Sequence, residues 1–385
     1  MNRIRKVISV LILLLSVMIL FSGCVVGELE PAGPETVPTE PSGPRTLSVA
    51  ELEGKFRSRG RTVFDSEGLH LYGTADSFEF NAECRGTVSV TAEVTGTVGQ
   101  DWFNGVFFTV YVDGSRLDIR PHLNSVGKTK LVLAEGLENG FHRFELYRQT
   151  EWGTDGTVIT HLTLDGTVSE PPAAGEFLIE FIGDSFTTGY GNMDWLEYDG
   201  LWAGESIYED GTGTVGFMVC HELDYDYSVI ALSGIGVLCG PNPQPMLEIY
   251  DRYPLRYDET YTYPSDRTAD VVFIRISGND YSVKDQYGYT DEDIQRGMEE
   301  LVGKVRRRNP EAKIVLLGNG KRPSSSSPLQ QKLGGEEAGI YFHNLPLDGN
   351  GHGSHPSVKG NENVKKGLSL YLRKLLGVYQ RPKTG

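Results

Sequence analysis

The chain has 385 residues, with 36 lysines and arginines against 52 aspartates and glutamates, and a net charge of −16. This length suggests about two domains at roughly 150 residues each. The 47 glycines and 10% aromatic residues indicate a loop-rich globular chain and exclude disorder over its whole length. An acidic chain without a basic block repels phosphate, so we expect no nucleic acid partner. Four cysteines in this length exclude a disulfide scaffold.

Residues 1–23 are typical of a signal peptide. A basic stretch ending at Lys6 precedes an apolar run at 7–21, which is shorter than the about 20 apolar residues of a membrane span. The run ends in Ser22-Gly23-Cys24, which resembles the bacterial lipobox, whose cysteine becomes lipidated after cleavage. We therefore expect an exported bacterial lipoprotein, anchored through Cys24 to the outer face of the cell membrane. The alternative is an ordinary signal peptide followed by an incidental cysteine.

Residues 24–45 are rich in proline and lack hydrophobic periodicity. This composition predicts an extended tether that holds the folded part of the chain away from a membrane. A tether suits an anchored, exported protein, although it does not by itself indicate an activity.

Residues 46–168 show the pattern of an all-β segment. Short alternating apolar runs recur, such as 69–72 and 87–94, and the run 107–112 continues into Asp113-Gly114, a strong hairpin signal. Strands of this kind without an intervening helix predict a β-sandwich domain. Such a sandwich either binds sugar or braces a neighbouring domain, and we favour bracing.

Residues 175–380 show a different pattern, in which apolar strands alternate with helices. Strands are expected at 177–182, 228–232, 271–276 and 313–317. A helix at 291–308 and a closing helix around 364–375 carry apolar residues at helical spacing. This alternation predicts a parallel sheet covered by helices on both faces. Ligands of such sheets bind beyond the carboxyl ends of the strands.

Four residue types gather at the ends of these predicted elements. Ser185 follows the first strand, Gly234 the second and Asn279 the third, and His355 precedes the last helix. A serine hydroxyl becomes a nucleophile when an imidazole takes its proton, and fixed N–H donors stabilise the oxyanion that forms in acyl transfer. We therefore expect Ser185 and His355 to be catalytic. The Ser185 and Gly234 backbones and the Asn279 side chain are the expected oxyanion-hole donors.

These blocks resemble the SGNH (GDSL-like) hydrolases, and among them carbohydrate esterase family 2. The stretches that carry the resemblance are 179–185, 189–192, 231–236, 247–252, 278–282, 355–357 and, in the N-terminal part, Gly140-Phe141-His142 running to Glu151. The resemblance covers nearly all of residues 60–376. It implies an N-terminal jelly-roll sandwich followed by an SGNH domain with three α/β/α layers, and the removal of acetyl groups from plant cell-wall polysaccharides such as xylan and glucomannan.

The block around the predicted base departs from the common SGNH pattern. Many SGNH enzymes place Asp three residues before the catalytic His, where this chain has His352. The resemblance to family 2 implies a Ser–His dyad in which a backbone carbonyl orients the imidazole. Asp348 and His352 are the two candidates for an orienting contact to His355.

Aromatic residues near the predicted site are candidates for sugar binding. Trp195, Trp202 and Tyr208 lie in a stretch after the nucleophile, and Tyr281 follows Asn279. They either stack on sugar rings or pack the loop. The carboxylates of 194–210 suggest either glycoside hydrolysis, which uses a carboxylate pair, or a solvated acidic loop, and we favour the loop.

We expect neither a metal nor a cofactor, because the pair His352 and His355 lacks companions at ligand spacing. Cys84, Cys220 and Cys239 are expected to be buried thiols, although export permits a bridge between the last two.

The sequence thus predicts a serine esterase that removes O-acetyl groups from plant cell-wall polysaccharides through an acyl-enzyme. Its partner is an acetylated polysaccharide or oligosaccharide. The alternatives are an SGNH acyl hydrolase acting on cell-envelope glycans or lipids, and a non-catalytic carbohydrate-binding lipoprotein.

Overall fold

The computed structural model describes residues 43–96, 104–151, 155–196, 205–253, 261–262, 267–318 and 327–378. The contacts divide the chain into two units, Met1–Ser42 and Gly43–Gly385. The predicted signal peptide, Cys24 and most of the predicted tether lie outside the described residues. Both predicted folded segments lie within the second unit. No helix in the described part of the chain is long and apolar enough to cross a membrane.

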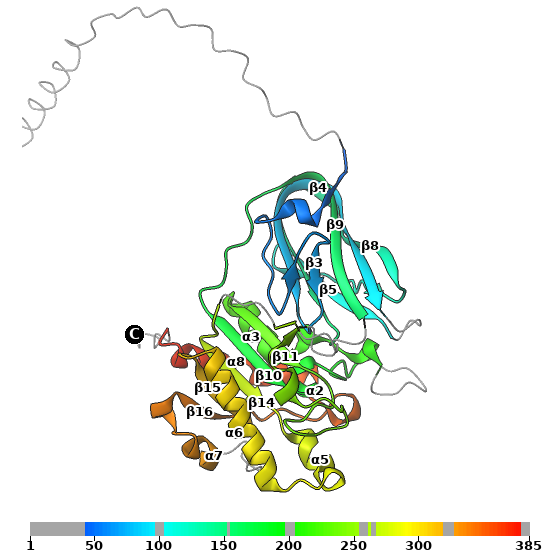
Figure 1. The fold of residues 1–385 in the computed structure, drawn as a ribbon. Coiled ribbons are helices and arrows are strands. Elements are labelled where there is room, and N and C mark those ends of the chain that lie inside the picture. Colours follow the sequence, from blue (N-terminus) through cyan, green and yellow to red (C-terminus); the bar gives the residue numbers. More distant parts are fainter. Residues whose placement is uncertain are drawn as a thin grey trace, which may run out of the picture. The chain divides into compact units, whose positions relative to one another are not determined.

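The N-terminal part of the second unit is an antiparallel sheet with the strand order β2-β3-β9-β4-β8-β5-β6, in which β1 also pairs with β9 and β7 with β5 (Figure 1). The strands are β1 (Arg45–Ser48), β2 (Val63–Phe64), β3 (Leu69–Leu71), β4 (Ser77–Gly96), β5 (Val106–Val112), β6 (Ser115–Arg116), β7 (His122–Leu123), β8 (Gly127–Arg148) and β9 (Asp155–Val168). A short 3-10 helix, η1 (Val49–Leu52), interrupts the predicted all-β pattern. The antiparallel sheet is as predicted, and the jelly-roll connectivity stays a prediction.

The long strands β4 and β8 are paired along most of their length, but their register shifts between Cys84 and Ser89. Gly86 lies within this irregular stretch and has a φ of +70°, a backbone conformation that glycine adopts at low cost. Alternate side chains of the sheet form a closed apolar core, in which the rings of Phe80 and Phe144 stack with centroids 4.8 Å apart.

The C-terminal part contains a five-stranded parallel sheet with the order β11-β10-β14-β15-β16. The strands are β10 (Leu178–Gly183), β11 (Asp226–Ala231), β14 (Val271–Arg275), β15 (Lys313–Gly318) and β16 (Ile340–Asn344). The first four match the strands predicted from the sequence, and β16 is an addition. A separate two-stranded ribbon consists of β12 (Arg252–Tyr253) and β13 (Tyr261–Thr262).

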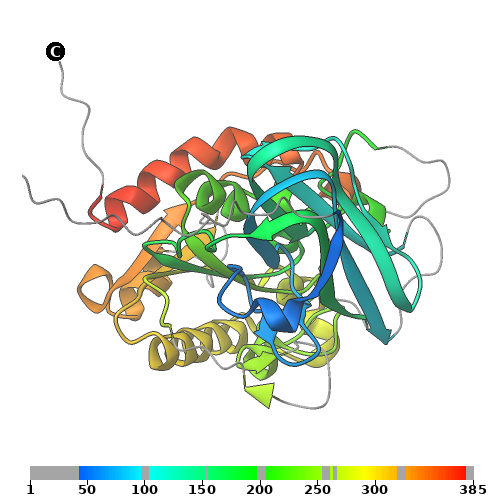
Figure 2. The ribbon, with the colours of Figure 1, turned by 90° about the horizontal axis from the view of Figure 1, so that it is seen from above.

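Helices cover both faces of the parallel sheet (Figures 1 and 2). Phe181 and Phe273 point to the face covered by α3 (Val215–Leu223) and α8 (Val358–Leu375), whereas Ile182 and Ile274 point to the face covered by α6 (Asp291–Arg308). The shorter helices are α2 (Ser185–Thr188), α4 (Met246–Ile249), α5 (Gly278–Tyr287), α7 (Ser327–Lys332), η2 (Ser206–Tyr208), η3 (Gly211–Gly213), η5 (Glu336–Ala338) and η6 (His352–Ser354). The predicted three-layer α/β/α arrangement is confirmed.

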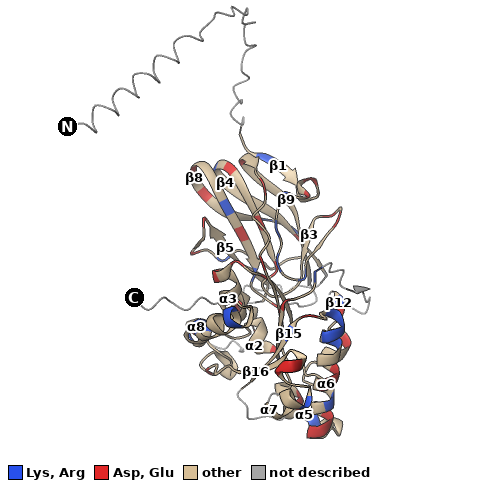
Figure 3. Ribbon diagram, turned by 90° about the vertical axis from the view of Figure 1, so that its left-hand side faces the viewer, with Lys and Arg blue, Asp and Glu red and all other residues tan. Residues whose placement is uncertain are grey.

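Helix α6 shows how local sequence sets an element. Thr290 and Asp293 form a capping box at its N-terminus, and apolar residues from Ile294 to Val305 face the core. Its first turn is acidic and its last turn basic, as the helix dipole favours. Figure 3 shows basic residues gathering at the end of α6 near β12, where Lys304 and Arg308 lie within 4 Å of Asp251.

Buried ion pairs join the antiparallel sheet to the parallel sheet. The Arg57 guanidinium donates to Asp226 at 2.7 and 3.1 Å and to Asp224 at 2.9 Å. The Gly60 amide donates to the Tyr227 carbonyl at 2.9 Å. These contacts fix the start of β11 against the segment before β2, so the two sheets pack as parts of one unit.

Candidate active site

Ser185 and His355 lie side by side although 170 residues separate them. Ser185 is the first residue of α2, directly after β10, and His355 lies in the loop before α8. The Nε2 atom of His355 is 2.9 Å from Oγ of Ser185. This is the geometry of a nucleophile in contact with its base.

The strand order explains why the nucleophile lies at this edge. The chain goes from β10 to β11 on one side and then to β14 on the other. The order of the sheet therefore reverses at β10. In open α/β sheets the crevice at such a switch point, beyond the carboxyl ends of the strands, is where ligands bind.

The turn that carries Ser185 is held by Asp184. Oδ1 of Asp184 accepts the Phe186 amide hydrogen at 3.1 Å and pairs with Arg275 at 3.2 Å. The Arg275 guanidinium lies 3.7 Å above the Phe186 ring, within the range of a cation–π contact. Asp184 thus shapes the turn that carries the nucleophile.

The two remaining oxyanion candidates line the same cleft as Ser185 and His355. Gly234 has a φ of +74° and its carbonyl accepts the Asn242 amide hydrogen at 3.0 Å. The Asn279 side-chain amide donates to the Ile235 carbonyl at 2.8 Å. This bond uses one of the two hydrogens on Nδ2. It orients the amide while leaving its second hydrogen available.

The backbone of His352, and not a carboxylate, faces the second nitrogen of His355. Nδ1 of His355 lies 3.0 Å from the His352 carbonyl oxygen. Because a carbonyl only accepts, the hydrogen is on Nδ1, and Nε2 is free to accept the proton of Ser185. The His352 ring lies 3.1 Å from the Met193 carbonyl through Nε2, and its centroid is 3.9 Å from that of Tyr208.

Asp348, the other orienting candidate, binds elsewhere. Its two carboxylate oxygens accept hydrogens from the Ser357 amide and hydroxyl, each at 2.8 Å. Ser357 is the N-cap of α8. Asp348 therefore supports the start of this helix, and the structure shows it bound to Ser357 rather than to His355.

The electrostatics of His355 suit a general base. Burial lowers its pKa from the ordinary value, while the hydrogen bond to His352 and the charge of Asp184 oppose this effect. The lowered pKa keeps the imidazole neutral at neutral pH, the form that accepts a proton.

The cleft has a volume of about 660 Å³ and is open to solvent. Several of its lining residues carry polar side chains. It is lined by Ser185, Tyr190, Ser233, Gly234, Pro241, Asn242, Pro243, Gln244, Asn279 and His355. The loop 241–244 was not identified from the sequence, because no chemical motif marks it.

The predicted sugar-binding aromatics are not among these lining residues. Trp195 is 57% exposed, and Trp202 lies outside the described residues. Tyr208 is 2% exposed and packs against His352, which favours the alternative that this side chain packs the loop. Tyr281 packs against the core beneath α6.

The acidic stretch after the nucleophile also differs from the expectation of a solvated loop. Glu209 and Asp210 are buried. The Asp210 carboxylate binds Thr212 and pairs with Arg116 at 2.9 Å. These two acids fold back into the protein instead of facing solvent.

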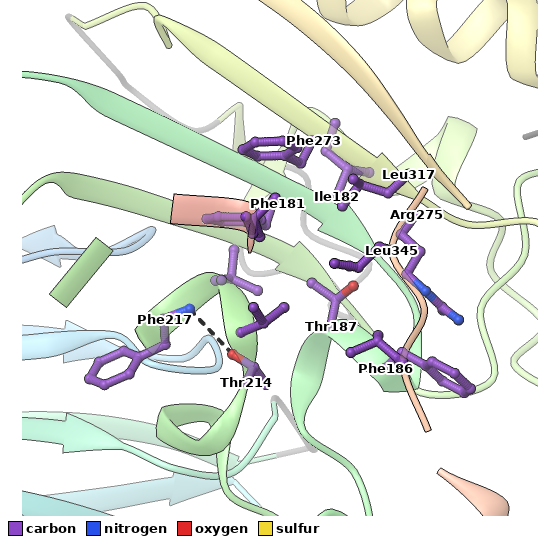
Figure 4. Close-up of a pocket in the computed structure, with 15 residues that line it drawn as sticks. Phe181, Ile182, Phe186, Thr187, Thr214, Phe217, Phe273, Arg275, Leu317 and Leu345 are labelled. Atoms are coloured by element: carbon purple, nitrogen blue, oxygen red, sulfur yellow. Dashed lines mark hydrogen bonds between the residues drawn. The ribbon is translucent and has the colours of Figure 1, made fainter. Parts of the chain in front are cut away.

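A small apolar cavity of about 30 Å³ lies behind α2, on the side away from the cleft. Figure 4 shows Phe186 and Thr187 of α2 beside Leu345, with Phe181 and Phe273 of the sheet above them. A cavity of this size holds about one water molecule, so it is a packing gap behind the nucleophile turn.

Other chemistry-bearing side chains lie away from the cleft. Asp65, Glu67 and His70 place ligand-type atoms within 4.8 Å of one another at the β2–β3 turn, where Asp65 also pairs with His70 at 3.1 Å. They are the group best suited to hold a metal in the described residues. Cys220 and Cys239 are buried free thiols, as is Cys84, so the permitted bridge between Cys220 and Cys239 is not formed.

Residues 181–341 match the model of the GDSL-like lipase/acylhydrolase family. The predicted resemblance to the GDSL-like hydrolases is confirmed. The matched segment begins within β10 and contains Ser185, Gly234 and Asn279, whereas His355 lies beyond it.

Two curated relatives align with most of the chain. The cellulase/esterase CelE of Acetivibrio thermocellus is 27% identical over 301 residues, which are 72% of this chain and 35% of that protein. The chain thus spans about a third of the length of this relative. The acetylxylan esterase / glucomannan deacetylase of Cellvibrio japonicus is 24% identical over 282 residues, 67% of this chain and 76% of that protein.

Solved structures of carbohydrate esterases share the fold. The acetyl xylan esterase Est2A of Butyrivibrio proteoclasticus superposes with a TM-score of 0.74 at 19% identity, over 88% of this chain and all of that one. A family two carbohydrate esterase of Cellvibrio japonicus gives 0.71 at 16% identity, over 88% of this chain and 99% of that one. At these identities the likeness shows the fold, and it includes the antiparallel part of the chain.

Proposed function

We propose that this chain is a serine esterase that removes O-acetyl groups from plant cell-wall polysaccharides. The observation that carries the proposal is the 2.9 Å contact between His355 Nε2 and Ser185 Oγ, in an open cleft that Gly234 and Asn279 also line. A hydroxyl, a neutral imidazole and N–H donors are the groups that acyl transfer requires.

The reaction follows from this geometry in two halves. Ser185 Oγ attacks the acetyl carbonyl carbon while its proton passes to His355 Nε2. The oxyanion of the tetrahedral intermediate faces the N–H groups of Ser185, Gly234 and Asn279. His355 then returns the proton to the sugar oxygen as the ester bond breaks, which leaves acetyl-Ser185. A water molecule, deprotonated by His355, releases acetate by the same steps in reverse order.

The wall of the cleft supports a carbohydrate substrate. Asn242, Gln244 and Tyr190 place amide and hydroxyl groups along an open cleft, and such groups bind sugar hydroxyls by hydrogen bonds. The relatives named acetylxylan esterase and glucomannan deacetylase point to xylan and glucomannan as the polymers to test. Acetylated cell-envelope glycans remain the second candidate, because they share the same hydroxyl-rich chemistry.

The N-terminal part and the location of the protein complete the proposal. We infer that the antiparallel sheet is a jelly-roll sandwich that braces the catalytic part, which the buried pair of Arg57 with Asp226 and its partly exposed pair with Asp224 support. We also infer that the protein is an exported lipoprotein held to the membrane through Cys24.

The test is acetate release from acetylated xylan, glucomannan and envelope glycans by the wild-type chain and by Ser185→Ala. We expect the wild type to release acetate from at least one plant polymer and the variant to keep its fold but lose the activity. A variant that keeps more than about a hundredth of the rate would contradict Ser185 as nucleophile. Sugar binding without acetate release by the wild type would favour the non-catalytic alternative.

A further inference from the structure

The carboxylate of Glu151 reaches from the antiparallel sheet to the loop after β11 that contains Ser233 and Gly234. It lies just after β8, in the part of the chain that precedes the hydrolase fold. Its Oε2 atom accepts the backbone hydrogen of Ser233 at 2.6 Å. Ser233 lines the cleft and directly precedes Gly234. The contact therefore connects the N-terminal sheet with the residue before a proposed oxyanion donor.

The structure assigns Glu151 the role of a positioning residue for the oxyanion hole, an inference that rests on the proposed function. The direction of the Gly234 N–H depends on the peptide plane between Ser233 and Gly234. Glu151 holds the preceding peptide group through the Ser233 N–H, and Asn242 holds the following one through the Gly234 carbonyl, so the plane between them is fixed from both sides. Gly234 has a φ of +74°, so the loop lacks the restraint that a side chain would supply there.

Contacts from both parts of the chain hold this loop: Thr188 of α2 lies 3.4 Å from the Ser233 hydroxyl, and Glu151 binds the Ser233 amide. Downstream of Gly234, Ile235 accepts a hydrogen from the Asn279 side chain, which belongs to the hydrolase fold. Upstream, the Ser233 amide donates to the carboxylate of Glu151, which lies just after β8. A bond from a backbone N–H to a carboxylate is shorter and stronger than one to a neutral oxygen.

Glu151 is itself held on a rigid support. The buried Arg148 side chain donates to the backbone carbonyls of Thr150 and Glu151, at 3.0 and 3.1 Å, and to that of Leu71. The Glu151 amide donates to the buried carboxyl of Glu209. Burial and the charge of Glu151 raise the pKa of Glu209 well above its usual range. The carboxylate of Glu151 is thus presented by the sheet and not by a free loop end.

Two substitutions separate the hydrogen bond from the charge. Glu151→Gln keeps an oxygen at the same reach and removes the charge, whereas Glu151→Asp keeps the charge and withdraws it by one methylene. We expect Glu151→Gln to stay within about threefold of the wild-type kcat. We expect Glu151→Asp and Glu151→Ala to lose about 10- to 100-fold in kcat with KM changed less than about threefold, because displacing an oxyanion donor costs less than removing it. Equal losses in Gln and Asp, or no loss in Asp and Ala, would overturn the inference.

A second readout reports on the hole itself. A phenylboronic acid that adds to Ser185 forms a tetrahedral adduct with an oxygen directed at the oxyanion donors. We expect its inhibition constant to rise in Glu151→Ala by the same factor by which kcat/KM falls. A purely structural role for Glu151 would lower the thermal midpoint and leave the inhibition constant of the folded enzyme unchanged, which would also overturn the inference.

Glu205→Gln is the matched control. Glu205, like Glu151, lies close enough to Tyr190 to raise the pKa of its hydroxyl, but none of the hydrogen bonds found among the described residues joins its carboxylate to Ser233. We expect its kinetics to match the wild type. Failure of the proposed function would appear as an inactive wild type, whereas failure of this inference would appear as an active Glu151→Ala variant beside an inactive Ser185→Ala variant.

Discussion

The Nδ1 atom of His355 lies 3.0 Å from the backbone oxygen of His352. Backbone geometry therefore orients the proposed base, and the side chain at position 352 contributes only by packing against Tyr208 and binding the Met193 carbonyl. This arrangement separates the orientation of the imidazole from any titrating carboxylate.

Three substitutions around the base should therefore have unequal effects. We expect His355→Ala to lower kcat/KM by several orders of magnitude, because the base and the nucleophile act as one unit. His352→Ala and Asp348→Asn should each cost at most about tenfold, because they remove secondary contacts. For Asp348→Asn the main effect should be a loss of about 1 kcal/mol in stability, as for a weakened helix cap. Steady-state kinetics on one acetyl ester check this; a collapse in Asp348→Asn comparable to that in His355→Ala would restore a full triad.

Gly191 offers a test of the carbonyl itself. Its φ is +65°, and a Cβ added there would lie 2.7 Å from the His352 oxygen. We expect Gly191→Ala to displace this carbonyl and lower kcat by about 10- to 100-fold, since small misplacements of catalytic groups cost about this much. Gly86→Ala is the control, because Gly86 has a φ of +70° with nothing within 4 Å of an added Cβ. The positive φ should cost each variant about 1 kcal/mol of stability, and the close contact adds to this only at position 191. Equal activity of the two folded variants would contradict the role of the carbonyl.

The acid limb of the pH–rate profile should lie below the ordinary histidine pKa of about 6.5. Burial lowers the pKa of His355, and the positive charge of Arg275 lowers it further. Activity requires the neutral imidazole, so the rate rises with pH through the folded-state pKa and is complete at neutral pH. We expect Arg275→Gln to move the limb toward higher pH. The pH profiles of kcat/KM for the wild type and Arg275→Gln check the direction of this shift. An acid limb above about pH 6.5 in the wild type would contradict the effect of burial on the pKa of His355.

Arg59 should be important for stability. Its side chain is fully buried and donates to Glu79, which is also fully buried. Removing one partner of a buried pair costs about 3–5 kcal/mol. Because Arg57 and Arg143 also lie within 4 Å of Glu79, we expect a loss near the lower end of this range for Arg59→Ala in urea unfolding. Lys55→Ala breaks the exposed pair of Lys55 with Glu170 and should cost at most about 1 kcal/mol. Similar losses in the two variants would refute the importance of the buried pair.

Membrane association tests the proposed lipid anchor. We expect Cys24→Ser to release the protein from the membrane fraction, because a chain without its lipid has lost its proposed attachment. Fractionation of cells that express either form gives the answer. Equal membrane association of the two forms would contradict lipidation at Cys24.

The sequence predicted those parts of the fold that have a simple periodicity. The helix at 291–308 was predicted with the bounds of α6, because one face of it is apolar and the other charged. Helix α3 was missed because its residues are apolar on nearly all sides, a pattern that buried strands share. Helix α5 was missed for the opposite reason, since its residues are mostly polar.

Local pattern also predicted where the four expected site residues lie along the chain. Ser185, Gly234, Asn279 and His355 each follow or precede an element that local pattern reveals, and topology alone brings their ends together. The reach of Glu151 to Ser233 and the burial of Glu209 depend on contacts across 82 and 58 residues of chain. No local pattern encodes such contacts, so an acidic loop that looks solvated in sequence folds into the interior.

The bonds of Arg57 to Asp226 across the two sheets bear on modular recombination. Asp226 also accepts from Arg267 and from the Gly175 amide. One carboxylate thus binds Arg57 of the N-terminal part and Arg267 of the C-terminal part. A chimera that joins a foreign sandwich to this hydrolase near residue 175 would inherit Asp226 without Arg57 and Ser233 without Glu151. Such a chimera would need to keep Arg57 and Glu151. The antiparallel sheet therefore cannot be replaced by a foreign sandwich without loss of contacts to the hydrolase part.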